Sequence, residues 1–342
     1  MIFQENYSLK HLNTFGIDVS AKYFSTFKNT DELAECLDFI TLPTANRQMP
    51  TLILGGGSNI LFTDSYNGLV LKNEIEGIEN IKEDAEHVYV RAGAGVGWHE
   101  FVLYCIENGL GGAENLSLIP GSTGASPMQN IGAYGAEVKD IFHELEAYSI
   151  QDKKIVKFSK EGCEFDYRES VFKNKYKGDF VITSVTFRLN KMPVFNTSYG
   201  ALETELQKAG VRELSLKAIS DAVTSIRRSK LPDPAVIGNA GSFFKNPAID
   251  NKQFEILKNE FPAIVGYPVN DNTTKLAAGW LIEKAGWKGF RKGDAGCHER
   301  QALVLVNYGN AKGNEILHLS EKIIDSVKLM FDVQLQREVN IV

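Results

Sequence analysis

The chain has 342 residues, of which 43% are hydrophobic and 23% are charged. This length and composition suit a folded protein of two or three domains. The 43 acidic residues outnumber the 37 basic ones, and the net charge of -6 argues against general binding to nucleic acid or membrane surfaces. The N-terminus lacks a basic region followed by an apolar core, and no later stretch is apolar for the length of a membrane span. We therefore expect a cytoplasmic protein.

The first part of the chain predicts strands that run into glycine clusters. Residues 31–40 predict a short helix capped by Thr30, and residues 51–54 predict a strand followed by GGGSN. The alternating pattern at 88–92 predicts another strand, followed by GAGVG. A helix with apolar residues at helical spacing then begins at Trp98 and ends at Gly109.

The middle of the chain contains a long irregular segment. Residues 111–135, GGAENLSLIPGSTGASPMQNIGAYG, have neither helical nor strand periodicity, which is typical of a functional segment. Strand patterns at 145–150, 154–158 and 180–189 predict a meander. A helix over 216–228 then precedes LPDP, which we interpret as the domain boundary.

Beyond LPDP the pattern predicts a smaller domain of mixed helices and strands. It predicts a helix from Asp250, which has capping-box spacing to Gln253, a helix near 275–285, a strand at 302–306 and an amphipathic helix over 313–331. The final residues, 333–341, alternate in polarity, which predicts a strand with Val333, Leu335, Val339 and Ile341 on one face.

The cysteines give no sign of disulfides or metal. Cys36, Cys105, Cys163 and Cys297 lack CxxC spacing, and the first two lie on apolar stripes of predicted helices. We interpret all four as reduced thiols. Cys297 is followed by His298, but adjacent residues rarely face one ion together, so we expect no metal site there.

The glycine clusters are ambiguous when each is considered singly. Glycine permits tight turns and close approach, so such clusters can place backbone N–H groups around a phosphate. GGGSN lacks the Lys-Ser or Lys-Thr of a nucleotide-triphosphate loop, and GAGVG lacks GxGxxG spacing and a later acidic residue at a strand end. Each cluster is equally consistent with a simple tight turn.

The motifs together are more specific. The chain contains GGGSNILF at 55–62, AGAGVGWHEFV at 92–102, LIPGSTGASPMQNIGAYG at 118–135, CEFDYRESVFK at 163–173, RRSKLPDP at 227–234, GNAGSFFKNP at 238–247, HERQALVLVN at 298–307 and REVNIV at 337–342. In this order they resemble the UDP-N-acetylenolpyruvoylglucosamine reductases of bacterial cell-wall synthesis, in the class with a longer tyrosine-bearing loop. One departure is Ser126, where the family pattern has alanine.

The resemblance implies an α+β fold with a flavin-binding region first. It implies an FAD-binding domain of the vanillyl-alcohol-oxidase (PCMH) type at 1–215, with subdomains at about 1–75 and 76–215. A smaller α+β substrate-binding domain with its leading helix would follow at 216–332, and a C-terminal strand at 333–342 would return to the cleft.

The resemblance also implies the reaction. NADPH would reduce noncovalently bound FAD, and the reduced flavin would convert UDP-N-acetylglucosamine enolpyruvate to UDP-N-acetylmuramate for peptidoglycan synthesis. The partner would be this nucleotide sugar, with no nucleic acid or membrane, and the enzyme would be monomeric. Two rival readings remain: another FAD-linked oxidase or dehydrogenase of the same fold, or a redox-inactive module that binds nucleotide sugars.

The family pattern places cofactor residues in two segments. By resemblance, the FAD pyrophosphate would be held by Gly55, Gly56, Gly57, Ser58 and Asn59. The rest of the flavin cleft would be lined by Ile119, Pro120, Gly121, Ala125, Gln129, Asn130 and Gly132. An extended cofactor needs many backbone donors and little side-chain bulk, which this composition supplies.

Three residues match the catalytic positions of the family. Ser242 would be the general acid, Arg168 would bind the substrate carboxylate, and Glu338 would help to stabilise the enolic form. Each has a plain structural alternative. Ser242 fits a turn hydroxyl, Arg168 fits a surface pair with Glu169 or Glu164, and Glu338 fits a solvated side chain on a strand.

Five further residues match substrate-binding positions: Tyr134, Tyr199, Lys230, Asn246 and Gln301. Tyr199 would lie on a loop over the substrate diphosphate, and its alternative is an aromatic residue packed beside a turn. Lys230 and Asn246 would bind diphosphate or carboxylate oxygens, although a lysine is more often simply solvated.

Overall fold

The computed structural model describes residues 2–39 and 49–342 and divides the chain into two units. The first unit comprises Met1–Tyr7, Ala21–Gly56 and Asn67–Ser229, and the second comprises Ser8–Ser20, Gly57–Tyr66 and Lys230–Val342. Both units are discontinuous in sequence, and one boundary falls inside the glycine cluster at 55–59. The domain limits expected from the family resemblance stay a prediction.

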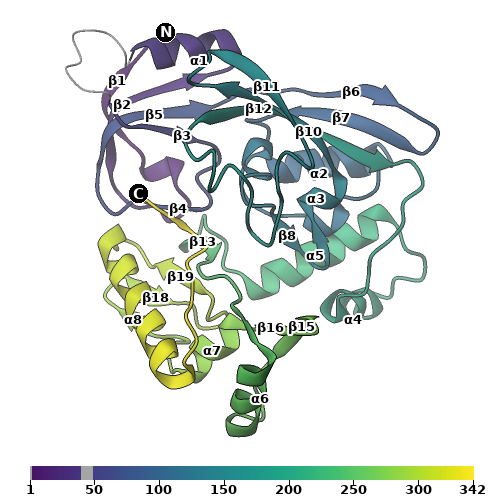
Figure 1. Cartoon of the computed structure of the whole chain (residues 1–342), viewed down its shortest axis with the longest axis vertical. Helices are drawn as coiled ribbons and strands as arrows, with labels where there is room; N and C mark the ends of the chain where they lie inside the picture. Colours follow the sequence, from purple (N-terminus) through teal and green to yellow (C-terminus); the bar gives the residue numbers. More distant parts are fainter. Residues whose placement is uncertain (1, 40–48) are drawn as a thin grey trace. The chain divides into compact units, whose positions relative to one another are not determined.

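The first unit contains two principal sheets (Figure 1). The four-stranded sheet has the order β1 (Gln4–Ser8), β2 (Ser20–Phe27), β5 (Tyr66–Asn73) and β3 (Thr51–Leu54). The five-stranded sheet has the order β11 (Lys154–Ser159), β10 (Phe142–Ser149), β12 (Phe180–Asn190), β7 (His87–Gly93) and β6 (Ile78–Glu83). The predicted meander is wrong in its last step, because β12 pairs with β10 rather than with its predecessor β11.

The first unit contains three helices that were predicted from apolar spacing, α1 (Thr30–Phe39), α2 (Trp98–Glu107) and α5 (Leu216–Lys230), and two that were not, α3 (Val138–Ile141) and α4 (Gly200–Lys208). In α2, Trp98 and Phe101 are buried against Phe187 of β12, and Gly109 follows the helix at φ +70. The predicted cap of α1 is corrected: the Asn29 side chain accepts from the backbone N–H of Glu32 at 2.9 Å, so Thr30 is already helical.

The segment predicted to be irregular contains only short elements. These are the 3-10 turns η2 (Glu114–Leu116) and η3 (Thr123–Ala125) and the small hairpin β8 (Gly132–Ala133) and β9 (Ala136–Glu137). Three of its non-glycine residues, Leu118, Asn130 and Tyr134, have positive φ angles of 58, 43 and 49 degrees. Each left-handed residue costs about 1–2 kcal/mol, so the surrounding contacts must hold this backbone in place.

The second unit contains two small antiparallel sheets, a two-stranded parallel ladder at the C-terminus and three helices. One sheet has the order β13 (Gly238–Ser242), β19 (Val304–Asn307), β18 (Ala295–Cys297) and β17 (Arg291–Lys292). The other has the order β14 (Ala248–Asp250), β16 (Thr273–Leu276) and β15 (Gly266–Asn270). The helices are α6 (Asn251–Glu260), α7 (Ala278–Lys284) and α8 (Gly313–Phe331), and the turn η1 (Lys10–Leu12) also belongs to this unit. A core around the apolar face of α8 includes Ile316, Ile323 and Val327.

Two predictions in this unit are refined by the structure. Asp250 caps α6 by accepting from the backbone N–H of Lys252 at 2.7 Å, whereas the Gln253 side chain donates to the Asp332 carbonyl, so no reciprocal capping box forms. The helix expected near 275–285 is shorter, because residues up to Leu276 belong to β16.

The C-terminal segment is less regular than the predicted strand. Only β20 (Asn340–Ile341) forms a ladder, in parallel with β4 (Ile60–Leu61) (Figure 1). Val333, Leu335 and Val339 are buried as expected, but Ile341 is exposed and that part of the prediction is wrong. The alternation of apolar and polar residues at 333–341 therefore reflects which side chains of an extended segment are buried, and it does not indicate a continuous β-ladder.

The four cysteines are free and buried. Burial raises the pKa of Cys36 to about 11 and that of Cys163 and Cys297 to about 12. Cys297 donates to the Ala302 carbonyl at 3.1 Å, which gives its thiol a structural partner. Across residues 2–39 and 49–342, no helix has the length and apolar character needed to cross a bilayer.

Candidate active site

Two glycine-bearing segments of the first unit lie in backbone contact. A Cβ on Gly56 would lie 2.7 Å from the Gly121 Cα, and one on Gly55 would lie 2.5 Å from the Ser122 Oγ. A Cβ on Gly124 would lie 2.4 Å from the Ala94 Cβ. Because real Cβ atoms do not approach so closely, only glycine permits this narrow cradle of main chain.

The backbone donors of the cradle are available to a ligand. Gly57 has φ +61, and a Cβ there would lie 1.9 Å from the Leu12 carbonyl oxygen. Within the described ranges, the backbone N–H groups of Gly56 and Gly57 have no protein acceptor, although Gly57 is buried. Leaving a buried N–H unpaired costs about 1–3 kcal/mol, so a group rich in acceptor oxygens fits this position. The residues present therefore fit the pyrophosphate of a dinucleotide cofactor.

Arg168 lies against the second cofactor segment. Its Nη2 donates to the Gly132 carbonyl at 2.5 Å, its Nη1 donates to the Asn130 carbonyl at 3.4 Å, and Glu137 lies 3.9 Å from Nη1. Only 17% of the side chain is exposed, and the residue itself adopts φ +57. The structure thus brings Arg168 together with Asn130 and Gly132, in a position more enclosed than a surface ion pair.

The side chain of Asn130 holds the main chain of this segment. Its amide donates to the Asp166 carbonyl at 3.0 Å and to Glu137 at 3.1 Å, and its carbonyl oxygen accepts from the Lys139 N–H at 3.1 Å. Asn130 is fully buried. Because both ends of the side-chain amide are bonded to protein groups, the amide holds the local backbone in place. Any contact of Asn130 with a cofactor would therefore come from its backbone.

Tyr134 and Tyr199 meet edge to face, with ring centroids 5.4 Å apart. Burial raises the pKa of Tyr134, whereas Tyr199 is 46% exposed at the start of α4. The sequence analysis missed Asn115, whose buried amide donates to the Tyr134 and Asn196 carbonyls, each at 2.8 Å. Asn115 therefore connects the two tyrosine-bearing segments, and no local pattern indicates such a bridge.

Ser242 is the last residue of β13 and follows a β-bulge. The register with β19 shifts between Asn239 and Ser242, and Gly241 has φ +69. The Asn239 side chain fixes the bulge by accepting from the Gly241 N–H at 2.9 Å. Within the part of the chain that the structure describes, the Ser242 hydroxyl has no hydrogen-bond partner. A bulge re-aims a side chain, and here it presents an uncommitted hydroxyl.

Glu338 lies beside this strand. Its backbone N–H donates to the Phe243 carbonyl at 2.8 Å, and its carbonyl accepts from the Asn59 side chain at 3.3 Å. Arg337 and Phe244 form an antiparallel bridge at the same place. The second unit therefore brings Glu338, Asn59 and the strand that bears Ser242 together, although Asn59 and Glu338 are 279 positions apart in the chain.

The remaining predicted residues have more ordinary surroundings. Asn246 accepts from the Ala278 N–H at 3.0 Å and so caps α7, and Gln301 accepts from the Leu303 N–H at 3.3 Å. Lys230 is exposed at the end of α5.

The unexpected Ser126, in the second cofactor segment, is buried. Its hydroxyl donates to the Thr123 carbonyl at 2.7 Å, so the extra polar group has a partner at the end of η3. Ile119 and Gln129 are partly buried, whereas Pro120 and Ala125 are exposed.

Comparison with known proteins gives the family. The chain is 50% identical to the UDP-N-acetylenolpyruvoylglucosamine reductase of Amoebophilus asiaticus and 48% identical to that of Flavobacterium johnsoniae, with 100% of both chains covered in each case. The chain belongs to the UDP-N-acetylenolpyruvoylglucosamine reductase family. Residues 21–159 match the model of an FAD binding domain, and residues 233–342 match the C-terminal domain of this reductase family.

A solved structure of the reductase family has the same fold. The UDP-N-acetylenolpyruvylglucosamine reductase from Thermus caldophilus superposes with a TM-score of 0.67 at 22% identity, covering 99% of this chain and 98% of that chain. The predicted fold class, an FAD-binding domain followed by a smaller α+β domain, is confirmed. The predicted family membership is confirmed as well.

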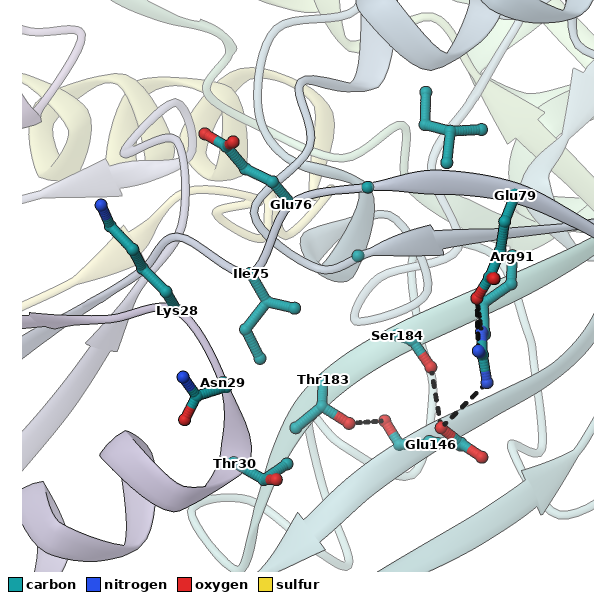
Figure 2. A pocket seen from close by; sticks show the side chains of 13 residues that line it. Lys28, Asn29, Thr30, Ile75, Glu76, Glu79, Arg91, Glu146, Thr183 and Ser184 are labelled. Atoms are coloured by element: carbon teal, nitrogen blue, oxygen red, sulfur yellow. Dashed lines mark hydrogen bonds and ion pairs between the residues drawn. The ribbon is translucent and has the colours of Figure 1, made fainter.

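A separate cavity of about 500 Å³ lies in the first unit of this reductase-family chain, and none of the predicted site residues lines it (Figure 2). Arg91 donates to Glu79 through both Nε and Nη2 and lies 3.9 Å from Glu146 (Figure 2). Ser184 also donates to Glu146, at 3.2 Å. Arg91, Glu79 and Glu146 therefore pair with one another, and the lining also includes the charged residues Lys28 and Glu76 (Figure 2).

Proposed function

We propose that this chain reduces UDP-N-acetylglucosamine enolpyruvate to UDP-N-acetylmuramate, with noncovalent FAD as cofactor and NADPH as electron donor. The observation that carries this proposal is the 50% identity to a reductase of this name over the whole of both chains. The match of residues 21–159 to an FAD binding domain and the fit of the glycine cradle to a pyrophosphate support the cofactor. The reaction would supply a precursor of peptidoglycan.

The FAD that Gly55–Asn59 would hold would supply the hydride-transfer chemistry, with NADPH as the hydride source and the terminal carbon of the substrate alkene as the acceptor. The alkene electron pair then moves to the neighbouring carbon and its carboxylate, which must be stabilised and protonated on carbon. We assign the proton to the Ser242 hydroxyl, because that hydroxyl is uncommitted in the protein.

Two charged residues would serve the developing enolate. Arg168 would bind the carboxylate, since its planar guanidinium presents several donors and its side chain is held beside Asn130 and Gly132. Glu338 would stabilise the enolic form from the segment next to Phe243.

We assign the cofactor and substrate contacts to the residues of this chain that match the motif positions of the family. The FAD pyrophosphate would lie on Gly55–Asn59, and the flavin would lie along the segment from Ile119 to Gly132. Tyr134, Tyr199, Lys230, Asn246 and Gln301 would bind the nucleotide sugar, with Tyr199 on the longer loop of its class. The exposure of Tyr199 and Lys230 leaves their polar groups accessible.

We also propose a monomer that acts in the cytoplasm, where nucleotide sugars and NADPH meet. A native mass near 37.9 kDa would support the monomer, and twice that mass would contradict it.

The test combines spectroscopy with a two-step redox titration. The purified protein should be yellow, and acid precipitation should release the colour into the supernatant, because the cofactor is noncovalent. Anaerobic NADPH should bleach the flavin, and the enolpyruvyl nucleotide should restore it. Absence of flavin would favour a nucleotide-sugar binding module, and reoxidation by a hydroxy acid's keto product but not by the enolpyruvyl nucleotide would favour another flavin dehydrogenase.

A further inference from the structure

The turn that carries Tyr134 is left-handed at both of its residues. The strands β8 and β9 pair through Ala133 and Ala136, so Tyr134 and Gly135 form a two-residue hairpin turn, with φ angles of +49 and +81. Such a turn matches the right-handed twist of the strands, but it strains a residue that has a Cβ. Other contacts must therefore hold the tyrosine in this conformation.

Asparagine side chains bind the carbonyl groups of both turn residues. The Asn115 amide donates to the Tyr134 carbonyl at 2.8 Å. The Asn196 amide donates to the Gly135 carbonyl at 2.9 Å. Asn115 also donates to the main-chain carbonyl of Asn196, again at 2.8 Å. These three bonds join the hairpin turn, the 3-10 turn η2 and the segment that leads to Tyr199.

The η2 part of this network is fixed inside the first unit. Asn115 is buried. The next carbonyl, that of Leu116, accepts from the Trp98 Nε1 at 2.9 Å. The Ser117 hydroxyl bonds to the Ser220 hydroxyl of α5 at 2.8 Å. Asn115 thus reaches out from a turn that α2 and α5 hold in place.

The segment that receives these bonds is a connection between elements. Residues 191–199, all of which the structure describes, join β12 to α4 without a helix or strand. Asn196 and Ser198 are exposed. The Asn196 Oδ1 accepts from the Ser198 N–H at 3.2 Å and from its hydroxyl at 2.7 Å. Asn196 therefore fixes the main chain up to the residue before Tyr199, whose ring meets that of Tyr134 edge to face.

We propose that Asn115 and Asn196 are positioning residues that clamp the loop at 191–199 to the Tyr134 turn and so hold the Tyr199 hydroxyl in place for the substrate. The inference rests on the proposed function, which gives the substrate diphosphate to Tyr199. Because one Asn115 amide binds both segments, neither segment can move away without leaving a buried donor unpaired. A loosened loop would weaken binding and raise KM with little change in kcat, since the diphosphate does not react.

The first test compares three holoenzymes with the wild type. Asn115→Leu removes both donors at similar volume and without adding a charge, and Asn196→Ala breaks the clamp from its exposed side. The matched control is Asn314→Ala, whose exposed amide donates to the Thr63 carbonyl at 3.1 Å in the second unit. Chymotrypsin cleavage after Phe195 and Tyr199, followed by mass spectrometry, reports how often the loop opens.

We expect Asn115→Leu to be cleaved at these two bonds at least about fivefold faster than the wild type. Its KM for the enolpyruvyl nucleotide should rise roughly tenfold, with kcat within about twofold of the wild type. Asn196→Ala should change the cleavage rate and KM by about threefold, because it removes one bond of the clamp to the turn. Asn314→Ala should change neither.

A double variant separates this role from a general loss of stability. If Asn115 acts through the Tyr199 hydroxyl, Asn115→Leu combined with Tyr199→Phe should have about the KM of Tyr199→Phe alone, roughly tenfold above the wild type. Independent effects would multiply to roughly 100-fold.

Three results overturn the inference. Unchanged cleavage at Phe195 and Tyr199 in Asn115→Leu shows that the amide does not hold the loop. Faster cleavage with an unchanged KM, or a 100-fold rise of KM in the double variant, shows that Asn115 does not act through Tyr199. Should Asn115→Leu fail to fold, Asn196→Ala, alone and combined with Tyr199→Phe, decides by the same measurements. A wild-type holoenzyme that does not turn over the enolpyruvyl nucleotide contradicts the proposed function, and the cleavage rates still decide whether the clamp holds the loop.

Discussion

Asn130 and Arg168 in the first unit differ from Ser242 in the second unit in how their polar groups are used. In the first unit, Asn130 and Arg168 donate to main-chain carbonyls, and these bonds fix a backbone with several left-handed residues. In the second unit, the Ser242 hydroxyl has no partner among residues 2–39 and 49–342. Side chains that shape a cofactor cleft form hydrogen bonds with the protein main chain, whereas the hydroxyl of a proton donor must be available to bond the substrate.

The largest expected effect tests the unbonded hydroxyl of Ser242. In Ser242→Ala, NADPH should bleach the flavin at nearly the normal rate, because that step needs no proton from this hydroxyl. Reoxidation by the enolpyruvyl substrate should slow by roughly 100-fold or more, the scale of a lost general acid. Stopped-flow absorbance measures both steps on one sample.

The control for this variant is Ser326→Ala, which removes a serine hydroxyl bonded only to the Lys322 carbonyl within α8. It should leave both steps unchanged, and circular dichroism should show that both variants are folded. Reoxidation of Ser242→Ala at the wild-type rate would make Ser242 a turn hydroxyl, and the contrast between the units would lose its functional meaning.

A smaller effect tests the hydrogen bonds that the Asn130 side chain forms with the protein. Asn130→Ala removes three partly buried hydrogen bonds and leaves a methyl group at φ +43, so it should lower the free energy of unfolding by about 2–3 kcal/mol. Asn130→Gly removes the same bonds but relieves the backbone, so it should be less destabilised by up to about 1 kcal/mol. Urea unfolding of the apoprotein gives both values.

The matched control is Asn174→Ala, which removes one exposed bond to Glu169. Its stability should remain within about 0.5 kcal/mol of the wild type. If Asn130→Ala were as stable as this control, the amide would not be holding the segment, and a direct role toward the cofactor would become the better explanation.

The smallest effect concerns Tyr199, which is exposed and yet in ring contact with Tyr134. Tyr199→Phe keeps the ring contact and removes the hydroxyl proposed to bond the diphosphate, so KM should rise about tenfold, the cost of about 1.5 kcal/mol for a bond to a charged group. Flavin content should not change. Steady-state kinetics with Tyr267→Phe as an exposed-tyrosine control check this, and wild-type kinetics would make Tyr199 a packing residue.

Local elements with strong periodicity were predictable. The helices α2, α5 and α8 carry apolar residues at helical spacing, and β3 runs into glycines, so each was found close to its observed bounds. The strand β6 was not predicted, because its exposed residues lack an apolar alternation. The order β11-β10-β12 was also missed, since the connection from β11 to β12 is long enough to bypass the nearest edge.

The sequence by itself determined the family and supplied the candidate site residues, because motif order is carried by residue type. Only the tertiary structure decided which of these residues meet. The bonds from Arg168 to Gly132, from Glu338 to Phe243 and from Asn115 to Asn196 join positions far apart in the chain. Such bonds leave no local periodicity, because their partners are brought together by the packing of whole sheets and helices rather than by neighbouring residues.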